Sequence, residues 1–440
     1  MRQFGLRIQW ACANAWMKIL FVHQFLGAMG GAETDILLTA RQLQRRGHVP
    51  ALLHAETSGR AEEAWRQAFT ETMRLAGPAD CRTAREALAR IQPDLVYCHG
   101  LADLDVLQTL LDSLVPLVRR VHDHGMYCMR GYKYDYFTRA ICQRPTSWRC
   151  LLPCLAFVGR NSGGRFPIKW VSYTEKQREI RLNRRCCRLV VYSAYQKQEL
   201  LRNGFDPGKI DIHVPLHLGG PATRVSSFSD RNLVLFVGQI LRGKGVDLLL
   251  RALAKVTVPF EAAILGDGNH RAYCERLSAR LGLDRRVHFH GFVPREGLEQ
   301  FYADATLLAV SSVWPEPFGL VGREAMCHGL PIVAFDAGAV REWLAHRENG
   351  FLVPWKDTNQ FAARIEELLR DKDLARRLGH RGLEMVNRTE ATAHEIDTLE
   401  EMFLRVIGET RGSGAIQWMG TAPSATSSKE TTSISGCRPR

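Results

Sequence analysis

The sequence has no long hydrophobic run. None of its apolar stretches reaches the roughly 18 residues that a membrane-spanning helix needs, so the chain offers no spanning segment. It also has no evident short internal repeat. What remains, 45% hydrophobic and 24% charged residues in a chain of 440, is the composition of an ordinary globular protein. That length exceeds one typical domain and predicts two domains of roughly 200 residues each.

A convincing secretory signal is missing as well. The only clean apolar run near the start, residues 19–22, is too short for a signal core and predicts a strand. Because Met17 followed by Lys18 resembles a natural protein start, we expect residues 1–16 to form an unstructured extension. We therefore expect a cytoplasmic protein whose 12 cysteines are thiols rather than disulfides.

Acidic residues are scarce in one segment. Residues 119–185 contain 15 Lys or Arg against four Asp or Glu, with ten aromatics among them, in a chain of formal charge +13. Such a basic, aromatic surface suits an anionic membrane surface, which would place the protein peripherally on the inner face of the cell membrane, or a phosphorylated acceptor. A merely solvated basic surface is the alternative. No module typical of nucleic-acid binding is present, so we do not expect nucleic acid as a partner.

Short apolar runs alternate with helical patterns throughout the chain. In the first half, strands are predicted at residues 18–25, 49–55, 93–100, 115–123 and 187–193, with an amphipathic helix at 31–48. In the second half, strands are predicted at residues 232–240, 260–268, 286–292, 304–312, 330–336 and 349–354. Such β-α-β alternation predicts parallel sheets with helices on both faces.

The predicted fold class is therefore α/β, with two Rossmann-like doubly wound domains that face each other across a cleft. The expected boundaries are an extension at 1–16, an N-terminal domain at 17–220, a polar linker at 221–231, a C-terminal domain at 232–395, a C-terminal helix at 396–410 and a disordered tail at 411–440. Ligands bind such sheets at the carboxyl ends of the strands, so the turns at those ends are the candidate binding elements.

Two of these turns suit anionic ligands. Gly30 and Gly31 follow the first strand and open a helix, where paired glycines let a ligand approach the backbone and the helix N-terminus favours anions. Arg242 and Lys244 lie in a glycine-flanked loop after residues 232–240, and a lysine held there suits a diphosphate. A plain strand-to-helix turn and a solvated loop are the alternatives.

Two further strand ends are weaker candidates. Gly266, Asp267 and Gly268 form a turn on the ligand side of their strand, although a tight turn needs glycine for conformational reasons alone. Phe292 ends the predicted strand 286–292 at a position where main-chain groups would hold the edge of a base, and a simple buried strand terminus is the alternative.

Two glutamates flank a turn in residues 314–331, WPEPFGLVGREAMCHGLP. Glu316 stands between two prolines that impose extended backbone, and Glu324 lies about one and a half turns inside a helix predicted at 319–328. The two carboxylates therefore lie on two sides of a helix N-terminus, whose N–H groups attract phosphate. One acid would serve a sugar hydroxyl and the other a ribose; two unrelated surface acids are the alternative.

In order and spacing, these motifs resemble the retaining, nucleotide-sugar-dependent glycosyltransferases of family 4, which have the B-type glycosyltransferase fold. The resemblance covers residues 17 to about 395. Its most specific part runs from Glu316-Pro-Phe-Gly-Leu through Glu324-Ala-Met-Cys-His-Gly-Leu-Pro, followed by residues 334–338 and 349–353. Residues 30–33, 122–123, 244–245 and 266–268 agree in order and spacing.

The resemblance implies an acceptor-binding N-terminal domain and a nucleotide-sugar-binding C-terminal domain. Glu316 would contact the transferred sugar, Glu324 the ribose hydroxyls, and His122 would lie near the sugar and the acceptor. The implied catalytic residues are Glu316, His122 and Lys244. The implied donor-binding residues are Gly30, Gly31, Arg242, Lys244, Gly266, Asp267, Phe292, Phe318, Gly319, Leu320, Val321 and Glu324.

The implied reaction is hexosyl transfer, with retention of the anomeric configuration, from a nucleotide-diphosphate sugar to an acceptor hydroxyl. The acceptor would be a glycan or a lipid-linked sugar in the synthesis of cell-surface polysaccharide or glycolipid. No metal is required, because Lys244 and a helix N-terminus stabilise the leaving phosphate. A non-catalytic sugar-nucleotide-binding protein and a nucleotide-sugar epimerase are the alternatives. One departure is Gln239, which stands where the family often has an arginine; Arg242 is the candidate substitute.

Four cysteines lie inside the basic segment, at Cys128, Cys142, Cys150 and Cys154. Zn²⁺ takes four thiolates and orders loops that have little core, so a structural zinc is one interpretation. The spacing of the first two is irregular, and four free thiols is the other interpretation.

Overall fold

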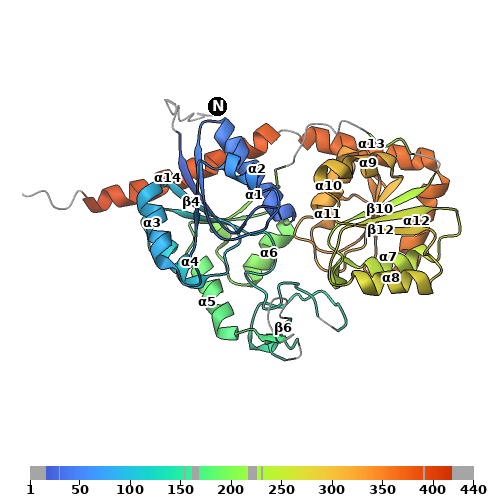
Figure 1. Cartoon of the computed structure of the whole chain (residues 1–440), viewed down its shortest axis with the longest axis horizontal. Coiled ribbons are helices and arrows are strands. Elements are labelled where there is room, and N and C mark those ends of the chain that lie inside the picture. The colour runs from blue at the N-terminus through green and yellow to red at the C-terminus, as the bar shows by residue number, and fades with distance from the viewer. Residues whose placement is uncertain are drawn as a thin grey trace, which may run out of the picture.

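Two α/β domains lie side by side in the computed structural model (Figure 1). It describes residues 16–418 except 29, 136, 153, 161–167, 217–224, 229–230 and 390–391. The expected extension, apart from residue 16, and much of the expected linker therefore lie outside the described residues. No helix in these ranges is both long and apolar enough to cross a membrane.

The N-terminal domain is built on a seven-stranded parallel sheet in the order β3-β2-β1-β4-β5-β8-β9. Its strands are β1 (Lys18–Leu26), β2 (Val49–Thr57), β3 (Glu71–Arg74), β4 (Leu95–Cys98), β5 (Leu117–Arg120), β8 (Arg188–Val191) and β9 (Ile210–Ile212). Its helices are α1 (Gly31–Arg45), α2 (Glu62–Ala68), α3 (Cys81–Ile91), α4 (Leu104–Leu111), α5 (Tyr173–Asn183) and α6 (Ala194–Arg202). The strand order reverses between β1 and β4, which is where doubly wound sheets bind ligands.

Strand β1 shows why this sheet is covered on both faces. Ile19 and Phe21 are buried in one hydrophobic core, and Leu20 and Val22 are buried in another. Successive side chains of a strand point to opposite faces, so a strand that is apolar at every position needs helices on both sides.

The C-terminal domain repeats this architecture with a six-stranded parallel sheet in the order β12-β11-β10-β13-β14-β15. Its strands are β10 (Leu233–Val237), β11 (Glu261–Leu265), β12 (Val287–Gly291), β13 (Leu307–Val310), β14 (Ile332–Phe335) and β15 (Gly350–Val353). Its helices are α7 (Val246–Leu253), α8 (Arg271–Arg280), α9 (Arg295–Asp304), α10 (Leu320–Cys327), α11 (Val340–Trp343), α12 (Thr358–Arg370) and α13 (Lys372–Thr389). The predicted class, two doubly wound Rossmann-like domains, is confirmed.

The last helix returns to the N-terminal domain (Figure 1). In α14 (Thr392–Trp418), Leu399 and Phe403 are buried in the same core as Ile19. The helix extends to Trp418, so the expectation of a disordered tail is wrong for 411–418, and residues 419–440 lie outside the described ones. A helix whose first turns are anchored by burial gains one hydrogen bond per added residue, which offsets the poor helix preference of the glycines there.

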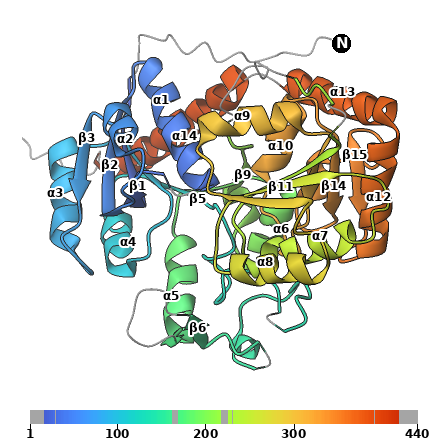
Figure 2. The ribbon, with the colours of Figure 1, turned by 45° about the vertical axis from the view of Figure 1, so that its right-hand side comes forward.

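A long segment between β5 and α5, residues 121–172, projects from the N-terminal domain and is called the insert below (Figure 2). Its only regular elements among the described residues are the 3-10 turn η1 (Trp148–Cys150) and the antiparallel pair β6 (Val158–Arg160) and β7 (Ile168–Trp170). The sequence patterns did not predict this small hairpin. The insert contains the four cysteines and many of the basic residues considered above.

Candidate active site

Glu316 is held in place by its backbone. It pairs with Gly338 as an isolated parallel bridge, and its carbonyl accepts a hydrogen bond from the Ala339 N–H at 2.9 Å. Gly338 has φ +70°, and a Cβ there would lie 2.4 Å from the Glu316 nitrogen. Only glycine therefore permits this close approach, which places Glu316 at the carboxyl side of β13 and β14.

The Glu316 carboxylate is paired with Lys244. Lys244 Nζ lies 2.7 Å from Glu316 Oε1, and the Ser312 hydroxyl donates to the same oxygen. Lys244 Nζ also lies 4.8 Å from the ring centre of Trp314. The sequence predicted that both charged residues belong to one site, and the structure brings them into direct contact.

The turn that carries Lys244 is packed against the end of β13. Lys244 ends the 3-10 turn η3 (Arg242–Lys244), and the following residue, Gly245, has φ +66°. A Cβ at Gly245 would lie 2.0 Å from the Ser311 carbonyl oxygen, and the Ser311 hydroxyl donates to the Lys244 carbonyl at 2.9 Å. These contacts fix the backbone from which the lysine side chain extends.

Helix α10 begins shortly after Glu316, at Leu320. Gly319 is its N-cap with φ +95°, and the indole N–H of Trp343 donates to the Phe318 carbonyl at 2.6 Å. The first backbone N–H groups of any helix lack intrahelical acceptors and favour anions. Inside α10, Glu324 accepts a hydrogen bond of 2.9 Å from the hydroxyl of Tyr302, which orients its carboxylate.

Side chains of the N-terminal domain hold the carbonyl groups on both sides of Glu316. His124 Nε2 donates to the Pro315 carbonyl at 2.7 Å, and the Ser193 hydroxyl donates to the Pro317 carbonyl at 2.6 Å. All of these groups are buried or nearly so, and burial lowers the pKa of His124. The two domains therefore share the construction of the Glu316 turn.

The glycine turn of the N-terminal domain meets α10. A Cβ at Gly31 would lie 2.9 Å from Leu320 Cδ1, so the starts of α1 and α10 are in contact. After the end of β12, the Arg60 guanidinium lies 4.8 Å from the ring centre of Phe292, a residue that is 57% exposed. The alternative of a simple buried strand terminus at Phe292 therefore does not hold, and its donor-binding role stays a prediction.

His122 belongs to a polar network at the carboxyl ends of β4, β5 and β8. Its Nε2 lies 2.9 Å from His99 Nδ1 and its Nδ1 lies 2.5 Å from the Tyr192 hydroxyl. Tyr192 donates to Asp35 at 3.0 Å, so the neutral tautomer of His122 carries its proton on Nδ1. Burial, and then the positive charge of Arg120, hold the pKa of His122 well below its usual range.

The turn at Gly266 has a packing reason of its own. Gly266 has φ +130°, and a Cβ there would lie 2.0 Å from the Gly238 carbonyl oxygen. The Asp267 carboxylate accepts a hydrogen bond from the Gly268 N–H at 2.7 Å and lies 3.7 Å from an Arg271 nitrogen. This turn follows β11 and packs against the residue after β10, and its binding role stays a prediction.

The four cysteines do not form a metal-holding group. No three His, Cys, Asp or Glu side chains in the part of the chain that the structure describes are grouped so that they hold a metal ion. Cys128, Cys142, Cys150 and Cys154 are free and half-buried, and burial raises the pKa of Cys150 and of Cys154. The described residues therefore show no grouped ligand set for zinc, and the zinc interpretation stays a prediction.

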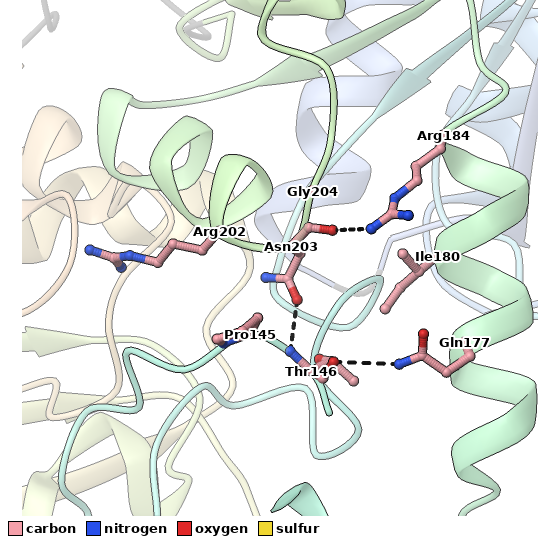
Figure 3. A pocket seen from close by; sticks show the side chains of 8 residues that line it. All are labelled: Pro145, Thr146, Gln177, Ile180, Arg184, Arg202, Asn203 and Gly204. Carbon is pink, nitrogen blue, oxygen red and sulfur yellow. Dashed lines mark hydrogen bonds between the residues drawn. The ribbon is translucent and has the colours of Figure 1, made fainter. Parts of the chain in front are cut away.

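A separate hollow lies between the insert and helices α5 and α6 (Figure 3). It is lined by Pro145, Thr146, Gln177, Ile180, Arg184, Arg202, Asn203 and Gly204. Its polar groups bond with one another: the Thr146 N–H donates to Asn203 at 2.9 Å, and Arg184 donates to the Asn203 carbonyl at 2.5 Å. Its volume of about 240 Å³ is below the roughly 300–1,000 Å³ of ligand pockets, and no predicted site residue lines it.

Comparisons with known proteins agree with this geometry. Residues 29–213 match the model of glycosyltransferase family 4, and residues 223–385 match the model of glycosyl transferases group 1. The two matches cover both domains, including the Glu316 turn and the Lys244 loop. The chain belongs to the family 4, group 1 glycosyltransferases.

Curated relatives match this chain over part of their length. It is 33% identical over 178 residues to the uncharacterized glycosyltransferase MJ1607 of Methanocaldococcus jannaschii, covering 40% of this chain and 45% of that protein. It is 32% identical over 249 residues to a D-inositol 3-phosphate glycosyltransferase of Nocardia farcinica, covering 52% and 54%. These matches span about half the length of each relative.

The fold matches solved glycosyltransferase structures. HepE of Anabaena, solved in complex with UDP and glucose, superimposes with a TM-score of 0.68 over 88% of this chain and 100% of HepE, at 20% identity. This chain therefore shares the B-type fold.

Several residues of the site were missed in the sequence. Tyr302, Ser312 and Trp314 contact the predicted acids or lysine, and Tyr192 and His124 come from the N-terminal domain. Ser312 and Trp314 lie within or directly after the strand pattern at 304–312, and Tyr192 follows its own strand, so position at a strand end was the available signal. Tyr302 had no such signal, because it lies in the last part of α9.

Proposed function

We propose that this glycosyltransferase moves a sugar from a nucleoside-diphosphate donor to an acceptor hydroxyl and retains the anomeric configuration. The contact between Lys244 and Glu316 beside the start of α10 carries the proposal. It places a cation, a carboxylate and a helix N-terminus at the switch region of the sheet. Those are the groups that a diphosphate and the sugar attached to it require.

Each group has a task in this proposal. The amides at the start of α10 and Lys244 bind the diphosphate and stabilise the negative charge that grows on it as the glycosidic bond breaks. Glu316 accepts hydrogen bonds from the sugar hydroxyls, and Glu324, oriented by Tyr302, accepts them from the ribose. Because Lys244 and the helix supply the positive potential, the reaction needs no metal.

The partners follow from the same groups. The donor is a nucleotide sugar, as supported by HepE, whose structures contain UDP, glucose and UDP-glucose. The N-terminal domain meets the donor site through His124, Ser193 and Gly31, so the acceptor hydroxyl approaches from that side. The acceptor class is a glycan or a lipid-linked sugar in glycan synthesis.

Peripheral attachment to an anionic membrane is part of the proposal. The insert exposes Trp148, Leu152 and Trp170, which are 66%, 65% and 79% exposed, and the Arg149 guanidinium lies 5.6 Å from the Trp148 ring centre. Exposed aromatic and aliphatic groups beside basic ones bind the boundary of anionic bilayers. Sedimentation with phosphatidylglycerol vesicles should recover the protein, and the variant Trp148→Ser with Trp170→Ser should stay in the supernatant. Equal recovery with neutral phosphatidylcholine vesicles would contradict the electrostatic part.

A donor screen tests the central proposal. Nucleotide sugars are added one at a time, and the one that binds the native state raises the melting temperature by mass action. Product analysis with that donor and a panel of acceptors then gives the anomeric configuration by proton NMR. An inverted product would contradict retention, and no thermal shift with any nucleotide sugar would contradict the donor site itself. In the transfer assay, the variant Glu316→Gln is the matched control, which should form little product.

A further inference from the structure

The insert of the N-terminal domain reaches the loop of the C-terminal domain that carries Lys244. The Phe137 carbonyl accepts a hydrogen bond of 3.4 Å from Arg242, and the Thr138 carbonyl accepts one from Lys356. A Cβ at Gly243 would lie 3.1 Å from Tyr134, so the ring of this tyrosine covers the turn. The backbone of η3 is therefore packed between the end of β13 on one side and the insert on the other.

Arg139 makes the strongest of these contacts. Its guanidinium donates two hydrogen bonds to the Asp247 carboxylate, of 3.1 and 2.9 Å. The two side chains are 11% and 7% exposed, so this bidentate ion pair is largely withdrawn from water. Asp247 lies in the first turn of α7, three residues after Lys244. Removing one partner of such a pair leaves the other charge buried and uncompensated.

The backbone of Arg139 is strained, which supports a functional role for this residue. Its φ is +59°, a left-handed conformation that few residues other than glycine adopt. Asp135 holds this conformation, because its carboxylate accepts hydrogen bonds from the Phe137 N–H at 3.1 Å and the Thr138 N–H at 2.8 Å. Strain of this kind persists where surrounding contacts over-determine it, often at functional sites.

The other charged groups around Asp247 do not replace Arg139. His270 Nε2 lies 3.9 Å from the carboxylate, and burial lowers the pKa of His270, which keeps the imidazole neutral. Lys356 and Arg242 lie near the pair, and each donates to a carbonyl group of the insert. Arg139 is therefore the guanidinium that satisfies both carboxylate oxygens.

We propose that Arg139 is a positioning residue: through Asp247 it fixes the turn that presents Arg242 and Lys244, so the N-terminal insert completes the donor site of the other domain. The proposal rests on the proposed function, in which that turn binds the donor diphosphate. It names a determinant of donor affinity outside the C-terminal domain.

The test compares diphosphate affinity in wild type and variants by isothermal titration with UDP, GDP and ADP. Arg139→Ala should weaken binding of the preferred diphosphate by at least about tenfold, and Arg139→Lys should weaken it less, because a lysine keeps the charge but loses the bidentate geometry. The pair Arg139→Asp with Asp247→Arg should recover part of the loss. Arg82→Ala, which removes an exposed partner of Glu86 on α3, is the matched control and should bind as wild type does.

Hydrogen exchange separates this inference from the proposed function, because it needs no ligand. In Arg139→Ala, amides of residues 242–248 should exchange faster, while those of β1 should not change. A folded Arg139→Ala protein that binds its diphosphate within twofold of wild type would overturn the inference, and so would unchanged exchange at 242–248. Wild type that binds none of the three diphosphates would instead refute the proposed function.

Discussion

Lys244 and Glu316, 72 residues apart in the chain, form an ion pair of 2.7 Å. The Glu316 side chain is only 5% exposed, whereas that of Lys244 is 25% exposed. The carboxylate therefore depends on the lysine and on Ser312 for its solvation. Either residue affects the donor site both by its own contacts and through its partner.

The first prediction concerns this pair. Glu316→Gln keeps the shape but removes the charge, and transfer should fall by at least about a hundredfold, the size of effect expected when a group acting in the transition state is lost. Lys244→Ala should weaken donor binding as well, because it removes a phosphate contact and leaves Glu316 unpaired. The loss of transition-state stabilisation in the double variant should be smaller than the sum of the losses in the two single variants, since the residues are in contact. Steady-state kinetics and circular dichroism measure rate and fold; full activity in Glu316→Gln would refute the site.

A second prediction addresses the orientation of Glu324. Tyr302→Phe removes the hydroxyl that donates to this carboxylate at 2.9 Å. A hydrogen bond to a charged group contributes about 1.5–3 kcal/mol, but Glu324 keeps its charge, so we expect a rise in the donor KM of several-fold to about tenfold with kcat little changed. A several-fold to tenfold fall in kcat with an unchanged KM would contradict a binding role.

Arg242 is the subject of the third prediction. It is the candidate to supply the positive charge that family members often have at the position of Gln239. The structure places Arg242 in η3 beside Lys244. Arg242→Ala should weaken donor binding, whereas Gln239→Ala, a change at an exposed neighbour, should not. Unchanged donor affinity and rate in Arg242→Ala would end the substitution hypothesis.

The docking of α14 leads to a fourth prediction. Phe403 is fully buried against the N-terminal sheet, and its neighbour Leu404 is 42% exposed. Phe403→Ala should lower the free energy of unfolding by about 3–5 kcal/mol, because it leaves a cavity in the core. Leu404→Ala is the matched control and should cost far less. Similar losses in the two variants, measured by chemical denaturation, would show that α14 does not pack as described.

A fifth prediction concerns pH and His213, which follows β9. Burial, and then the charge of Arg120, lower the pKa of His213 to about 4. In the unfolded chain a histidine has a pKa near 6.5. Between about pH 6.5 and 4 the unfolded state therefore binds a proton at His213 that the folded state does not bind. Stability should therefore fall as pH decreases through this window.

The variant His213→Gln should lose less stability than wild type over the same window, because it removes the group responsible. His380→Gln, a change at an exposed histidine of α13, serves as the control. Parallel pH profiles of unfolding for wild type and His213→Gln would contradict the prediction.

The local structure was predictable from the sequence because it depends on neighbours along the chain. Each predicted strand overlaps a strand of the structure, for example β10 within residues 232–240, since a run of apolar residues bounded by turns needs little else to specify it. Helix α10 falls within the predicted 319–328, because the glycine before it and the glycine and proline after it mark its ends. The glycine turns were found for the same reason.

Contacts between distant segments depended on the tertiary structure. No local pattern relates the residues that meet in the site. Examples are the ion pair of Lys244 with Glu316, the network around His122, and the ion pair of Arg139 with Asp247. The insert had no periodic pattern, so its hairpin emerged only in three dimensions. The sequence by itself determined which elements form and which residue types end each strand. The folding of two sheets against each other decided which of those residues meet, because long-range packing and charge pairing depend on positions that the order of residues does not state.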